Sequence, residues 1–196
     1  PSSKMPAHRM VTATPGSPAH DAGANMVRLR TLILLRWMAI AGQVAAILVA
    51  SLAYGLQLPL GLCVLAIGLS VIANLVLSML FPQNRRLSEA EAFLTLLFDL
   101  GQLAFLLFLT GGLTNPFAIL VLAPVTISAS TLRLRSTVVL GALAILAVSA
   151  AVFWYLPLRF ADGSELVVPR LFAFGFWLSI VIGLLFLGLY SRRVAT

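Results

Sequence analysis

The sequence predicts an all-α polytopic membrane protein, folded as a bundle of six transmembrane helices. Three observations predict it: 61% of the 196 residues are hydrophobic, only 10% are charged, and long apolar runs follow one another along the chain. A soluble domain is about 45–50% apolar and about 25% charged, and one of this size has too much surface to bury such an excess. The composition therefore excludes a soluble enzyme, a disordered chain and a disulfide scaffold.

The first 27 residues are expected to form a disordered cytoplasmic tail, because Pro, Ala, Ser, Gly and Thr dominate them. His8 and His20 lie in this tail without the cluster of partners that a metal site needs, and the single cysteine, Cys63, lies inside an apolar run. We therefore expect no metal site and no disulfide. The formal charge of +7 is attributed to residues that anchor the topology, so no nucleic-acid partner is expected.

Six apolar runs reach or approach the length of a membrane span, at about 32–53, 58–81, 92–110, 117–132, 137–157 and 171–190. A helix needs about 20 residues to cross about 30 Å of hydrocarbon. The first run is longer than the apolar core of a signal peptide, about 7–15 residues, so we expect it to remain as an uncleaved span. The fourth run is short and contains Pro124, so it is either a kinked short span or a re-entrant segment.

The distribution of basic residues favours six crossings with both termini in the cytoplasm. In that arrangement eleven of the 13 Lys and Arg residues face the cytoplasm, Arg36 counted among them, and only Arg159 and Arg170 face outward. If the fourth run fails to cross, the split falls to nine against four. The outer loops of the six-span arrangement, about 54–57, 111–116 and 158–170, are too short to form an external domain.

The loop between the third and fourth runs reads Thr110-Gly111-Gly112-Leu113-Thr114-Asn115-Pro116-Phe117. Local chemistry explains it as a turn: the glycines end one helix, Asn115 caps the next, and Pro116 suits its first position. A binding function is the alternative, because backbone N–H groups at a helix start lack partners. Those donors, the Asn115 amide and the flanking Phe108 and Phe117 suit an apolar, planar ligand with two carbonyl acceptors.

The pattern Gly111-Gly112-x-x-Asn115-Pro116-Phe117 resembles the GGxxNPF signature of the RegB/PrrB family of redox-sensing membrane histidine kinases. The preceding Phe98-Asp99-Leu100, the placement between the third and fourth of six spans, and the start at Leu29–Leu32 with Arg36-Trp37 are similar to that family as well. The resemblance covers about residues 28–193. It implies a bacterial inner-membrane sensing domain in which bound ubiquinone tunes a sensor histidine kinase, with quinone-binding residues Gly111, Gly112, Asn115, Pro116 and Phe117 of the heptad. The flanking Phe108 is added to this predicted site for its aromatic ring.

The resemblance also implies partners and missing parts. The family's cytoplasmic half carries the phosphoacceptor histidine, the ATP-binding domain and a redox-active cysteine, and this sequence shows no match to them. We therefore expect the kinase domains to be absent from this chain, together with autophosphorylation and phosphorelay to a response regulator. A homodimer is implied, since such kinases phosphorylate between subunits. The alternatives are a small transporter or channel, which lacks paired intramembrane charges here, and a quinone-using redox enzyme, which lacks histidines in its spans.

Two further patterns remain open on sequence grounds. Gln43, Asn74 and Asp99 are each about 10 Å inside three successive spans, so they form either a hydrogen-bonded polar layer that relays a signal or unrelated helix contacts. Asp99 is the only acid well inside a span and lies about 18 Å from Gly111 along its helix. On the sixth run, small residues recur at spacing four, at Gly175, Ser179 and Gly183. This stripe is either a dimer seam or a packing surface within one subunit.

Overall fold

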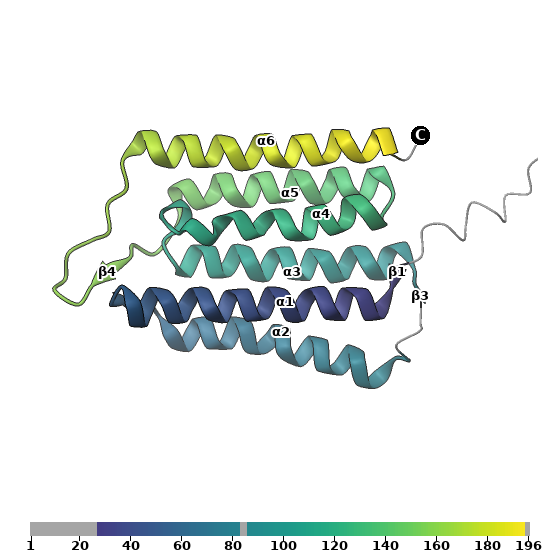
Figure 1. The fold of residues 1–196 in the computed structure, drawn as a ribbon, viewed down its shortest axis with the longest axis horizontal. Coiled ribbons are helices and arrows are strands. Elements are labelled where there is room, and N and C mark those ends of the chain that lie inside the picture. The colour runs from purple at the N-terminus through teal and green to yellow at the C-terminus, as the bar shows by residue number, and fades with distance from the viewer. Residues whose placement is uncertain (1–26, 83–85, 195–196) are drawn as a thin grey trace, which may run out of the picture.

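The computed structural model describes residues 27–82 and 86–194 as a bundle of helices whose axes run side by side (Figure 1). The expected tail lies almost wholly outside the described residues. The helices are α1 Leu29–Leu48, continued by the π-helical η1 Val49–Ala53, α2 Leu60–Leu80, α3 Glu89–Leu109, the 3₁₀ turns η2 Gly112–Thr114 and η3 Pro116–Val121, α4 Leu122–Thr131, α5 Leu134–Phe153 and α6 Arg170–Val194.

The helices form two halves that meet at α3. α1 packs on α2 and α2 on α3, whereas α4, α5 and α6 pack on one another, with α4 and α5 also against α3. In Figure 1, α1 and α2 lie to one side of α3 and α6 lies farthest away on the other. Buried Leu96, Leu100, Leu140, Ala144 and Val148 fill the space between α3 and α5. Five of these helices are long and apolar enough to span a membrane: α1 with η1, α2, α3, α5 and α6.

The fourth apolar run crosses the bundle although it has only 16 residues, six of them in η3 and ten in α4. A 3₁₀ helix rises about 2.0 Å per residue, so the run reaches about 27 Å instead of the about 24 Å of a continuous α-helix. Pro124 lies in the first turn of α4, where its missing N–H costs little. The predicted bundle of six membrane helices is therefore confirmed, and the fourth is lengthened by its 3₁₀ first part.

Contacts at the two ends of the bundle show where the fourth run begins and ends. After α4, Arg133 Nε lies 3.0 Å from Glu89 Oε2 and Ser136 Oγ donates to Glu89 Oε1 at 2.6 Å, beside the start of α3. At the opposite end, the Leu156 N–H donates to Phe108 O at 2.8 Å. We call these the basic end and the loop end. The last residues of α6 lie at the basic end, as does the start of α1 (Figure 1).

Each end of the bundle has one short antiparallel ribbon, which the sequence did not predict. At the basic end, β1 Val27–Arg28 pairs with β3 Arg86–Leu87, just before Ser88 and Glu91 cap α3 with reciprocal hydrogen bonds. At the loop end, β2 Leu56–Gln57 pairs with β4 Arg159–Phe160. The second ribbon places the α1–α2 connection against the long connection between α5 and α6, directly beside the glycine-rich loop.

The small residues of α6 do not share one environment. A Cβ added at Gly183 would lie 3.6 Å from Leu122 of the same chain, whereas one at Gly175 would meet nothing within 4 Å. The Ser179 hydroxyl donates to Gly175 O at 2.8 Å, which occupies it within its own helix. Gly183 therefore belongs to packing inside the subunit, and only the Gly175 end of the stripe is open to a second copy.

Candidate functional site

The glycine-rich loop requires both of its glycines. Gly111 and Gly112 have φ angles of 94° and 56°, in the left-handed region that other residues rarely adopt. A Cβ at Gly111 would collide with Thr114 Oγ1 and the Leu158 side chain, and one at Gly112 would collide with the carbonyl oxygen of Ala151. The two glycines thus let the end of α3 turn closely against α5 and the connection that follows it.

Asn115 makes the turn that the sequence predicts. Its Oδ1 accepts from the Phe117 N–H at 2.9 Å, which caps η3, and Pro116 occupies the first position. Its Nδ2 donates to Thr110 Oγ1 at 2.7 Å, and that hydroxyl donates to Leu106 O at 2.7 Å. One amide hydrogen of Asn115 remains for a ligand, because the other is used inside the turn.

A cavity of about 240 Å³ lies under this loop. Three of the residues predicted to bind a ligand, Asn115, Pro116 and Phe117, line it, whereas Phe108, Gly111 and Gly112 are not among its lining residues in the described part of the chain. The remaining wall comes from α1, η1, the ends of α3 and η2, and the β2–β4 connections, through Ala46, Ile47, Val49, Ala50, Tyr54, Leu56, Leu58, Thr110, Thr114, Leu158, Phe160 and Leu166. Sequence reasoning missed the contribution of the ribbon, because no motif marks either of its strands.

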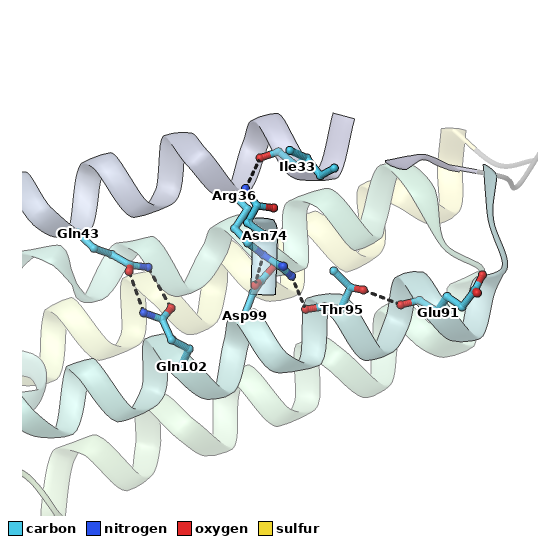
Figure 2. Close-up of polar contacts among 8 residues, drawn as sticks. All are labelled: Ile33, Arg36, Gln43, Asn74, Glu91, Thr95, Asp99 and Gln102. Carbon is cyan, nitrogen blue, oxygen red and sulfur yellow. Dashed lines mark hydrogen bonds and ion pairs between the residues drawn. The ribbon is translucent and has the colours of Figure 1, made fainter. Parts of the chain in front are cut away.

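Nearer the basic end, Asp99 is not the isolated acid that the sequence suggested. Arg36 Nε lies 2.8 Å from Asp99 Oδ1, and Arg36 Nη2 donates to Thr95 O at 3.4 Å (Figure 2). The Arg36 guanidinium also lies 5.6 Å from the centre of the Phe98 ring. Arg36 is only 6% exposed, so its assignment to the cytoplasmic flank was wrong. A charge about 10 Å inside a span is costly unless paired, which explains the contact.

The three polar residues that the sequence placed at one depth, as a layer or as unrelated contacts, have different partners. Gln43 and Gln102 exchange two hydrogen bonds, Nε2 to Oε1, at 3.2 and 2.9 Å (Figure 2). Asn74 Nδ2 donates to Ile33 O at 3.1 Å, and Asp99 pairs with Arg36. The polar interior therefore has two levels that connect α1 with α3, and one bond that connects α1 with α2. Gln102 was missed, although it lies three residues after Asp99 and hence on the same helix face.

The fold and these sites define an all-α integral membrane domain that has an apolar cavity beneath one loop and polar side chains in its interior. The chain belongs to the family described as the PilS-like transmembrane domain, which matches residues 21–168. Two proteins named sensor histidine kinase RegB, both from Cereibacter sphaeroides, are 61% and 63% identical to it over 186 residues.

Those 186 residues are 95% of this chain but 40% of each relative, so the chain spans less than half the length of the curated relatives it matches. The resemblance inferred from the heptad is thereby confirmed. No solved structure matches the chain.

Proposed function

We propose that this chain is the membrane sensor domain of a two-component sensor histidine kinase, and that ubiquinone bound beneath the glycine-rich loop carries the signal. The similarity to two sensor histidine kinases over nearly the whole chain supports the first part. The observation that carries the second is the cavity, because Asn115, Pro116 and Phe117 of the heptad all line it.

The cavity suits the ring of a quinone rather than the whole molecule. Its volume of about 240 Å³ falls just below the roughly 300–1,000 Å³ of pockets that enclose drug-sized ligands, so an isoprenoid tail would extend into lipid. Phe117 and Phe160 offer aromatic contact, and the second amide hydrogen of Asn115 is a donor to a quinone carbonyl. In this proposal ubiquinone is a bound signal, held without a covalent bond.

The full-length protein is then an ATP-dependent protein-histidine phosphotransferase of the bacterial inner membrane. It acts as a homodimer, has both ends of this domain in the cytoplasm, and passes phosphate to a response regulator. The membrane domain itself contributes binding and transmits its effect through the helices. Arg36, Asp99, Asn74, Gln43 and Gln102 are candidates for that relay, because their contacts connect α1 with α2 and α3.

The alternative of a small transporter gains one argument from the structure. The absence of paired intramembrane charges counted against it in the sequence, and the ion pair between Arg36 and Asp99 removes that objection. The similarity to sensor kinases still favours the sensor, since it covers 95% of the chain.

The test of the quinone site is equilibrium binding of ubiquinone to the purified, folded chain in nanodiscs. Phe117→Ala removes ring contact and should weaken binding, by up to a few kcal/mol. Phe186→Ala is the matched control, because Phe186 is an exposed aromatic residue of α6 outside the cavity. Equal affinity of the two variants and the unmodified chain would place the ligand elsewhere.

A further inference from the structure

A second hollow, of about 480 Å³, lies nearer the basic end along one face of the bundle. Its sides are α1, α3 and the fourth run, and it extends along α1 from Leu32 to Gln43, which is about 16 Å. In Figure 1, α1 lies on one side of α3 and α4 on the other. Most of the wall is apolar, with Leu96, Leu103, Leu120, Ala123 and Ile127 contributing.

The polar part of this groove is unusual for a surface that faces lipid. Arg36, Asp99, Gln43 and Gln102 all line it, together with Ser70 of α2 and Thr126 of α4. Arg36 is 6% exposed, its Nε is covered and pairs with Asp99 Oδ1 at 2.8 Å, and its Nη2 donates one hydrogen to Thr95 O. The Asp99 side chain keeps 21% of its surface exposed. The groove therefore places the Arg36 guanidinium, whose Nη atoms keep unused hydrogens, beside the partly exposed Asp99 carboxylate.

The charge balance decides what kind of head group fits there. Arg36 and Asp99 neutralise each other at 2.8 Å, so an ionic ligand would leave one unpaired charge in hydrocarbon. A hydroxyl group both donates and accepts, so it can donate to the Asp99 carboxylate and accept from Arg36 at once. A carbonyl group only accepts and therefore cannot use Asp99.

We propose that the groove between α1, α3 and the fourth run is a second binding site, which takes a neutral, lipid-soluble ligand through a hydroxyl group held by Asp99 and Arg36. The apolar walls hold the rest of the molecule. This proposal does not depend on a quinone in the cavity beneath the loop. Two sources share the required chemistry, a hydroquinone and a lipid alcohol.

The test compares hydroxyl-bearing probes with partners that lack the hydroxyl, using the whole chain in nanodiscs. One pair is a decyl-substituted hydroquinone and its quinone, and the other is monooleoylglycerol and methyl oleate. A charge-assisted hydrogen bond gives the hydroxyl member of a fitting pair an advantage of about tenfold or more in affinity. If the hydroquinone pair shows this advantage, the ligand is a hydroquinone; if the monooleoylglycerol pair shows it, the ligand is a lipid alcohol.

Two variants test whether the higher affinity for the hydroxyl-bearing probe arises in this groove. Asp99→Asn keeps the size of the side chain but removes the carboxylate, and it should abolish the advantage of the hydroxyl probe. Ala123→Phe fills the groove from α4 without touching the ion pair, and covers the case in which Asp99→Asn fails to fold. Ala142→Phe, at an exposed position of α5, is the matched control. Equal affinity within both probe pairs, or an advantage unchanged in the folded groove variants, would overturn the proposal.

Discussion

Asn115 has two separable roles, because its two amide atoms contact different groups. Oδ1 caps η3 by accepting from Phe117 N–H, and Nδ2 donates to Thr110 with one hydrogen to spare. Asn115→Ala should lose about 1 kcal/mol of stability through the cap and, as a quinone donor, about 2- to 12-fold in affinity. Asn115→Asp keeps the cap and removes the donor. Thermal unfolding of both variants measures the contribution of the cap, and quinone binding measures the contribution of the donor. If only Asn115→Ala binds quinone more weakly, the loss of affinity comes from the altered turn and not from the missing donor.

Gly112 offers a second test at the same loop. Its left-handed backbone and the carbonyl of Ala151 both oppose a side chain, whereas Gly163, with φ of 84°, has nothing within 4 Å of an added Cβ. Gly163→Ala should therefore cost about 1–3 kcal/mol from strain alone, and Gly112→Ala should cost distinctly more. Chemical denaturation of both variants measures the difference. Equal losses would mean that α5 moves away from the loop without cost.

These residues also show how far sequence reasoning reaches. The turn at Gly111–Pro116 was predictable because its chemistry is local: the glycine conformations and the asparagine cap depend on neighbours in sequence. The pairing of Arg36 with Asp99 was not, because it depends on the register between α1 and α3. Distance from the end of a run therefore placed Arg36 with the flanking cations, although its side chain lies inside the bundle.

At the scale of elements, the fourth run and α6 both depend on tertiary context. The 3₁₀ form of η3 lets a short run reach across, and no composition rule predicts it. α6 exposes most of its length, and its stripe divides between Gly183, which faces Leu122, and Gly175, which faces open space. A stripe of small residues could be recognised in the sequence, but which part faces α4 could not.

This division yields a prediction about self-association. Gly175→Ile adds bulk where nothing in the subunit opposes it, so the monomer should fold normally, and dimer formation should weaken if α6 forms the seam. Gly183→Ile should instead disturb the packing of α4 and lower thermal stability. Crosslinking in membranes and thermal unfolding separate the two effects. Unchanged crosslinking of a folded Gly175→Ile variant would place the dimer contact on another helix.

At the scale of the whole molecule, the described termini lie at one end of the bundle, which requires an even number of crossings. The bundle does not fix which side of the membrane that end faces, and the basic residues provide that argument. Removing Arg36 from the eleven cytoplasmic residues leaves ten against Arg159 and Arg170, so the bias survives the correction.

The topology prediction follows from this bias and from the crossing of the fourth run. Reporter fusions placed after Arg135 and after Arg193 should both report the cytoplasm, because both positions follow an even number of crossings. A fusion within residues 161–164, in the connection between α5 and α6, should report the outside and serves as the control. A cytoplasmic signal after Arg135 with an external one after Arg193 would mean that one later helix fails to cross. External signals at both, with a cytoplasmic control, would invert the whole bundle and place the quinone cavity on the cytoplasmic side.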